Sequence, residues 1–249
     1  MRIIERPSPN HAARRGDAPV DILLLHYTGM ISREHALARL CDPAAAVSAH
    51  YLIDTHGLVY RLVAEDRRAW HAGVGFWRGA RDINSRAIGI ELVNPGHEFG
   101  YRPFPQAQMA ALADLATGII ARHRAITPDR VLGHSDTAPA RKIDPGEKFD
   151  WAWLAEHGIG LWPRLSREEP ATDTFLSPAE TENIAKMQSL LAEFGYEVPQ
   201  SGIFGVATRA ATAAFQRHFR PWQIDGLPDH DTRARLEDLL AQRHRIGKA

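Results

Sequence analysis

The sequence predicts an α/β fold with a mixed central β-sheet flanked by helices, followed by a small C-terminal domain of three helices. Three observations support this prediction. Short apolar segments of strand length alternate with helical patterns over residues 1–160. Residues 161–180 carry three prolines, several charges and hydroxyl groups, which is typical of a linker. Residues 181–249 show only helical patterns separated by glycines, enough for a small domain that is marginal alone but adequate beside a larger one.

Three apolar runs have the length and composition of buried strands. The first, 21–28, carries His26 near its end, before Gly29 turns the chain away. The second, 87–93, carries Glu91 in its middle, and the third spans 131–134. Residues 49–54 and 58–63 are expected to form the two strands of a hairpin, with its turn at residues 56–57.

Helical segments fill much of the remaining chain. Ser32 can cap a helix over 33–40, which the Asp-Pro pair at 42–43 ends. A longer helix fits 105–124, because its apolar residues fall on one face. Residues 70–85 have no period and are expected to form a long loop, a kind of segment that often carries function. The other expected helices cover 150–157, 181–194, 205–219 and 229–243.

The composition excludes several classes of function. Lys plus Arg and Asp plus Glu both total 30, so no net charge attracts nucleic acid or an anionic membrane. The single cysteine, Cys41, cannot form an intramolecular disulfide or build a cysteine-based zinc site, so any metal must use His, Asp or Glu. The first ten residues lack the apolar core of a signal peptide, and no run approaches a membrane span. We therefore expect a cytoplasmic protein with no obligate protein partner.

The segment from 131 to 146 gathers a histidine, two aspartates and a lysine without any periodicity. His134 and Asp144 stand ten residues apart and can meet only if the loop between them folds back. Pro139, Pro145 and Gly146 make such a loop plausible. A His and an Asp brought together in this way suit a divalent metal, zinc first, whereas the alternative is a solvated loop with ordinary surface charges.

Adding His26 gives two histidines and one carboxylate, which leave a tetrahedral zinc ion one open position, as in catalytic sites. Glu91 could take a proton from water near such a metal. Lys142, two residues before Asp144, could stabilise an oxyanion. Each residue also has a structural interpretation, because the chain has 13 histidines, Glu91 could pair with an arginine and Lys142 could be a surface lysine.

Six short motifs together resemble the zinc-dependent N-acetylmuramoyl-L-alanine amidases of the type 2 amidase fold, a fold shared with peptidoglycan recognition proteins. They occur in the family's order and cover about residues 20–155. The motifs are Leu25-His26-Tyr27-Thr28, Val47-Ser48-Ala49-His50-Tyr51-Leu52-Ile53-Asp54, Ala69-Trp70-His71-Ala72-Gly73, Ile88-Gly89-Ile90-Glu91-Leu92, Gly133-His134-Ser135-Asp136 and Lys142-Ile143-Asp144-Pro145-Gly146.

The resemblance implies a role for each matching residue. It makes His26, His134 and Asp144 the zinc ligands. It makes Glu91 the catalytic carboxylate and Lys142 the residue that supports the transition state. His71 and Asn84 fall where family members line the substrate groove, and His50 is expected to be structural support.

The C-terminal segment resembles the three-helix peptidoglycan-binding domain that often accompanies such amidases. It departs from the family's pattern at Ser201, which replaces the usual acid, and at Leu227-Pro228-Asp229, which replaces a glycine-containing turn. The fold should survive because these are loop positions, and both departures argue against wall binding. The matching segments are Met187-Gln188-Ser189-Leu190-Leu191, Gly195-Tyr196, Gly202-Ile203-Phe204-Gly205-Val206-Ala207-Thr208, Phe215-Gln216 and Ile224-Asp225-Gly226.

The resemblance implies hydrolysis of the amide between N-acetylmuramic acid, or its 1,6-anhydro form, and L-alanine of the stem peptide, within peptidoglycan recycling. The substrate would then be a muropeptide or anhydro-muropeptide. Two alternatives remain open. One is a periplasmic amidase that acts on polymeric peptidoglycan through its C-terminal domain. The other is a muropeptide receptor without activity, although such receptors typically lose a metal ligand and all three are present here.

Overall fold

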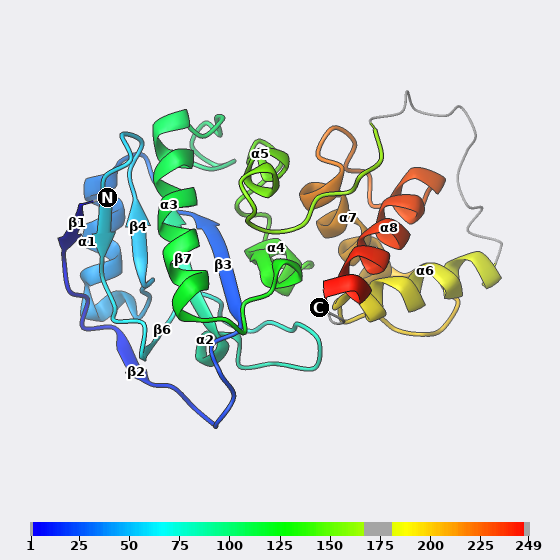
Figure 1. Ribbon diagram of the computed structural model, residues 1–249, viewed down its shortest axis with the longest axis horizontal. Helices are drawn as coiled ribbons and strands as arrows, with labels where there is room; N and C mark the ends of the chain where they lie inside the picture. Colours follow the sequence, from blue (N-terminus) through cyan, green and yellow to red (C-terminus); the bar gives the residue numbers. More distant parts are fainter. Residues whose placement is uncertain (1, 167–180, 247–249) are drawn as a thin grey trace.

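The structure, a computed structural model, describes residues 2–166 and 181–246 and confirms the expected α/β class (Figure 1). Its main sheet has six strands in the order β1-β5-β4-β7-β3-β8, and β2 and β6 form a separate antiparallel pair. The main sheet is mixed, because β4 and β5 are antiparallel whereas its other neighbours are parallel. The strands are β1 Ile3–Glu5, β2 His11–Ala13, β3 Ile22–Tyr27, β4 Tyr51–Ile53, β5 Val59–Arg61, β6 Arg67–Ala69, β7 Ala87–Leu92 and β8 Val131–Gly133.

Helices cover both faces of the main sheet. The longest helix of the N-terminal domain crosses one face, and a short helix follows β8 directly. The N-terminal helices are α1 Arg33–Cys41, η1 Pro43–Ala45, α2 Ile83–Arg86, α3 Gln106–Arg122, η2 Pro128–Arg130, α4 His134–Thr137 and α5 Trp151–Glu156. The C-terminal helices are α6 Thr181–Phe194, α7 Val206–Phe219 and α8 His230–Ile246.

The alternation of side chains along β3 divides the core between the two faces. Leu23 and Leu25 belong to the cluster that contains the apolar stripe of α3. Ile22 and Leu24 belong instead to a cluster that they share with the three C-terminal helices. All four side chains are completely buried, which explains why this segment is a continuous apolar run.

The face opposite α3 carries the polar groups of interest. At the β4 end of this face, α1 packs through Ala36 and Leu40 on a third apolar cluster. At the β3 and β8 end, the C-terminal helices cover the sheet, and Figure 1 shows them beside α4. His26 lies on the same face of the sheet as Ile22 and Leu24, because alternate residues of a strand share a face. It lies opposite Glu91 in the parallel register of β3 and β7. Both side chains therefore lie on the face opposite α3, between α1 and the C-terminal helices.

The C-terminal domain repeats one loop arrangement. The side chain of Gln188 on α6 accepts hydrogen bonds from the N–H groups of Ser201 and Gly202, and donates to the Thr208 hydroxyl. On α7, Gln216 does the same with Asp225, Gly226 and Thr232. Because the main-chain N–H of position 201 makes the contact, serine is accepted there in place of an acid.

The segment that joins the two domains is only partly described. Residues 161–166, assigned to the linker from their composition, lie against α8: Gln242 donates to Trp162 O and Arg235 donates to Ser166 O. Residues 167–180, the rest of the expected linker, lie outside the described residues. The boundaries 1–160, 161–180 and 181–249 therefore stay a prediction. Within the described residues, no helix has both the length and the apolar composition that a membrane span requires.

Candidate active site

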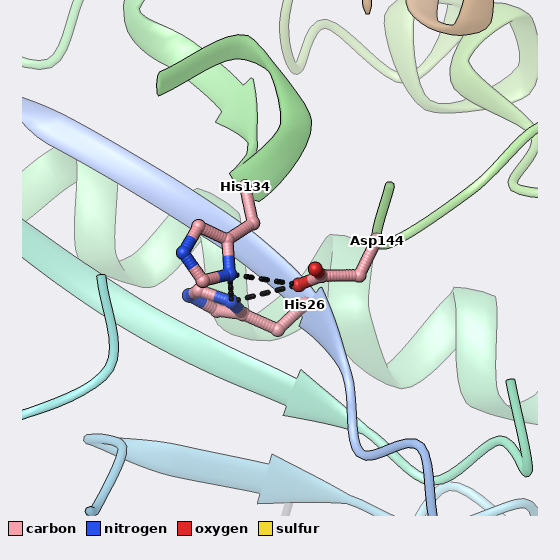
Figure 2. A group of neighbouring side chains, drawn as sticks. All are labelled: His26, His134 and Asp144. Carbon is pink, nitrogen blue, oxygen red and sulfur yellow. Dashed lines mark hydrogen bonds and ion pairs between the residues drawn. The ribbon is translucent and has the colours of Figure 1, made fainter. Parts of the chain in front are cut away.

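Three polar atoms meet at the carboxyl ends of β3 and β8. His26 at the end of β3, His134 at the start of α4 and Asp144 in the following loop converge as Figure 2 shows. The Nδ1 atoms of His26 and His134 are 3.0 Å apart, and they lie 3.0 and 3.1 Å from Asp144 Oδ2. All three side chains are buried. The expected folding back of the loop between 134 and 144 is thus present, and Ser135 N–H donates to Asp144 O within it.

Hydrogen bonds on the far side of each ring define the proton positions. His134 Nε2 lies 2.9 Å from Ala72 O and must donate to it, so His134 Nδ1 presents a lone pair to the cluster. His26 Nε2 lies 3.0 Å from His71 Nδ1. When His26 donates to His71, its own Nδ1 also presents a lone pair. Burial lowers the pKa of His26 to about 4, so the ring is neutral at neutral pH.

The donor set fits a zinc ion. Zinc binds imidazole in its neutral form, and in that form the two rings and the carboxylate direct lone pairs at one point. Tetrahedral zinc, bound at about 2.0–2.2 Å, separates its ligand atoms by about 3.3–3.6 Å, a few tenths of an ångström more than the observed spacing. Within residues 2–166 and 181–246, this is the one group of His, Cys, Asp or Glu with such geometry.

Asn84 supports the cluster from behind. Its Oδ1 accepts hydrogen bonds from the N–H groups of His71 and Ala72, at 3.0 and 2.9 Å. Ala72 O in turn accepts from His134 and from Arg141. Asn84 is buried and is not among the residues that line the cavity, so its expected place in the substrate groove stays a prediction. Its side-chain oxygen accepts both hydrogen bonds from the main-chain segment that orients His134.

His71 does line the cavity, as expected, and it lies over β7. A Cβ atom at Gly89 would come within 2.5 Å of His71 Nδ1, so the ring requires glycine beneath it. His50 is fully buried outside the cavity: its Nδ1 accepts from Gly89 N–H and its Nε2 donates to Arg67 O. His50 thus fixes the strand on which His71 rests, which is the structural role expected of it.

The cluster forms one wall of an open cavity of about 350 Å³. Glu91 and Lys142 line the same cavity. Glu91 Oε2 is buried, and it has no hydrogen-bond partner in the described part of the chain. Burial, together with the Asp144 carboxylate, raises the pKa of Glu91 well above its usual value, whereas Lys142 acts in the opposite direction. No arginine forms an ion pair with Glu91 among the described residues, which removes its structural interpretation.

Several residues of the cavity were not singled out from the sequence. Arg141 donates to Ala72 O and Val74 O, and this contact orders the segment that holds His134. The pattern gives no signal for this role, because Arg141 is one of several arginines in irregular segments. The Asp144 loop adds Ile143 to the wall. The rest of the wall comes from α1 and the segments around it, through Tyr27, Thr28, Gly29, Met30, Ala36, Arg39, Leu40, Val47, Ser48 and Trp70.

Both parts of the chain match known protein families. Residues 16–147 match the N-acetylmuramoyl-L-alanine amidase family, and residues 180–236 match a peptidoglycan binding domain family. The N-acetylmuramoyl-L-alanine amidase AmiD of Escherichia coli is 39% identical over 236 residues, which cover 89% of this chain and 82% of AmiD.

Two solved structures share the fold across both domains. The complex of E. coli AmiD with anhydro-N-acetylmuramic acid-L-Ala-D-gamma-Glu-L-Lys has a TM-score of 0.77 at 35% identity and covers 94% of this chain and 98% of its own. AmpDh3 of Pseudomonas aeruginosa in complex with anhydromuramic pentapeptide has a TM-score of 0.71 at 34% identity, with coverages of 90% and 94%. The chain therefore belongs to the N-acetylmuramoyl-L-alanine amidase family of amide hydrolases.

Proposed function

We propose that this chain hydrolyses the amide between the lactyl group of N-acetylmuramic acid, or its 1,6-anhydro form, and L-alanine of the stem peptide, with zinc held by His26, His134 and Asp144. The observation that carries the proposal is the triangle of ligand atoms 3.0–3.1 Å apart in the wall of a cavity that also contains an unpartnered Glu91. The complexes of AmiD and AmpDh3 with anhydro-muropeptides support this substrate class. We place the reaction within peptidoglycan recycling as part of the same proposal.

The bound zinc would act as a Lewis acid that activates water and polarises the scissile carbonyl. Glu91 would accept the proton of the attacking water and return it to the leaving amine nitrogen. Its raised pKa makes the carboxylate a stronger base than an exposed glutamate. Lys142 would stabilise the negative charge that develops on the carbonyl oxygen. His71 would contact the substrate, because it lines the cavity beside His26.

The experiment is a hydrolysis assay on 1,6-anhydro-N-acetylmuramoyl-L-Ala-γ-D-Glu-L-Lys, with released peptide measured by mass spectrometry. We expect release by the zinc-loaded chain, loss of activity on chelation, and recovery when zinc is returned. Lys142→Met should reduce kcat by about 100-fold, whereas Lys186→Met, an exposed lysine of α6, should not. Binding of the muropeptide without release of peptide would contradict the proposal and favour a receptor.

Polymeric peptidoglycan is a second candidate substrate, because residues 180–236 match the peptidoglycan binding domain family. Intact sacculi should be digested beside the small anhydro-muropeptide under the same conditions. A recycling role predicts faster turnover of the small substrate. Faster release of peptide from sacculi would favour a wall-acting amidase with the same chemistry.

A further inference from the structure

We propose that Tyr196 and His218 of the C-terminal domain are positioning residues for His134 and Asp144 of the N-terminal domain. The proposal starts from Asp136, which lies in α4 two residues after His134 and is 1% exposed. A carboxylate buried this deeply must be satisfied by donors. Two of its donors come from the other domain.

Asp136 accepts three hydrogen bonds, and two of them join the two domains. Its Oδ2 accepts from Gly133 N–H at 2.8 Å and from His218 Nδ1 at 2.7 Å. Its Oδ1 accepts from the Tyr196 hydroxyl at 2.6 Å. Burial raises the pKa of Tyr196 well above its usual value, so the hydroxyl remains a donor at neutral pH. The start of α4, and therefore His134, is held between its own main chain and two C-terminal side chains.

A second path leads from His218 to Asp144. The His218 ring stacks on Trp151, with centroids 3.7 Å apart and planes 23° apart. Trp151 and Pro145 both pack closely against Gly133. A Cβ atom added at Gly133 would lie 3.3 Å from Trp151 Cζ2 and 2.8 Å from Pro145 Cδ. Pro145 follows Asp144 directly, so His218 supports the main chain beside both proposed ligands.

Such support has a measurable consequence. Metal affinity depends on ligand atoms that are held in place before binding, and removal of an outer hydrogen bond typically costs 10–100-fold in affinity or activity. A purely structural interface would behave differently. The apolar cluster shared by the domains can stabilise the fold, but loss of a methyl group there would not move His134 selectively.

The test uses the full chain, and its phenylalanine variants keep an aromatic ring at each of the two positions. Tyr196→Phe and His218→Phe each remove one donor to Asp136, and the double variant removes both. His218→Asn returns an amide N–H near the position of Nδ1. Leu239→Ala is the matched control, because Leu239 is fully buried in the shared cluster and has no polar group to offer Asp136. Zinc affinity, kcat, KM and the melting temperature of the metal-free chain are measured for each.

We expect the double variant to bind zinc about 10- to 100-fold more weakly, and to lose about tenfold in kcat at saturating zinc with KM within twofold. Each single variant should lose part of this, and His218→Asn should recover affinity relative to His218→Phe. Leu239→Ala should lower the melting temperature and leave zinc affinity within twofold.

The inference would be overturned if the single and double variants kept zinc affinity and kcat within twofold while melting temperature fell as in Leu239→Ala. The single variants decide the question if the double variant does not fold. The inference rests on the proposed zinc site, and the wild-type chain separates the two claims. A wild type without zinc affinity contradicts the proposed function, whereas unchanged variants of a zinc-binding wild type contradict only the role of Tyr196 and His218.

Discussion

At the residue scale, the two imidazoles of the cluster are each fixed through the nitrogen that faces away from it. His134 is held by Ala72 O and His26 by His71. When both of these nitrogens donate, the Nδ1 lone pairs face the cluster as the proposed ligand atoms, and the contacts leave the rings little freedom to turn. Glu91 differs from both, because its buried oxygen has no such partner among the described residues. That difference separates residues held for binding from one available for proton transfer.

Glu91→Gln tests this distinction. Glutamine keeps the shape of the side chain but cannot accept the proton, so zinc should remain bound while kcat falls by about 100-fold or more. The exposed Glu98→Gln is the control and should retain full activity. A large fall in zinc content would instead make Glu91 a ligand, and an unchanged kcat would remove it from the mechanism.

Asn84→Ala tests the support behind the cluster. The substitution leaves the buried N–H groups of His71 and Ala72 without their acceptor, which should cost about 2–4 kcal/mol of unfolding free energy. Zinc affinity should fall by about tenfold, because Ala72 O orients His134. Denaturant unfolding and zinc titration measure the two effects. If KM alone rose, with stability and zinc affinity intact, Asn84 would be a substrate-binding residue after all.

At the scale of elements, Glu65 links α3 to the sheet through hydrogen bonds. It accepts hydrogen bonds from Tyr51 of β4, Arg122 at the end of α3 and the adjacent His123. Burial alone would raise the pKa of Glu65, but these donors outweigh it and lower the pKa to about 2. A carboxylate whose pKa is lower in the folded chain stabilises the fold above its unfolded pKa.

Glu65→Gln should therefore lower the unfolding free energy at pH 7 by roughly 2 kcal/mol, after allowance for solvent screening. The difference between wild type and variant should shrink as pH falls from about 4.5 toward 2, because the wild-type carboxylate becomes protonated. Urea unfolding at several pH values measures it. A difference that stayed constant over this range would show that the charge of Glu65 does not contribute.

At the scale of the whole molecule, the C-terminal helices complete the cover of the sheet. Ile22 and Leu24 of β3 and Leu132 of β8 are buried in a cluster shared with α6, α7 and α8. Trp77 of the long loop packs against Phe194 and Tyr196 in the same cluster. The N-terminal domain thus depends on the second domain for one part of its core.

A chain that ends at residue 166 should therefore be less stable than the full chain. Exposure of these apolar side chains should lower the melting temperature by about 10 °C or more. Activity on a small anhydro-muropeptide should persist only in part. An unchanged melting temperature would show that the domains are independent, and strong retention of residues 170–249 on sacculi would then favour a wall anchor.

The sequence predicted the α/β class, the central strands and the long helices, because these carry a period or a continuous apolar run. It did not predict β1, β2 and β6, which are three residues long, or α2 and α4, which are four. β4, β5 and β8 are equally short but lie within longer segments of strand-like sequence, whereas the missed elements do not.

The candidate site shows the same limit. The motifs brought His26, His134, Asp144, Glu91 and Lys142 to one cavity, as expected. The hydrogen bonds of Asn84 to the main chain were not predicted, because a side chain that bonds to main chain 12 and 13 residues away leaves no pattern in the sequence. The contacts of Tyr196 and His218 with Asp136 were missed for the same reason, since they join residues 60 and 82 positions apart.

The most direct test of the central claim is a crystal structure of the purified chain with anomalous diffraction measured on both sides of the zinc absorption edge. The account predicts one strong zinc peak, bounded by His26 Nδ1, His134 Nδ1 and Asp144 Oδ2 at about 2.0–2.2 Å, with a fourth position facing the cavity beside Glu91. A peak whose ligands included Glu91 or His71 in place of one of these three would contradict the account, as would the absence of a peak from crystals grown with zinc.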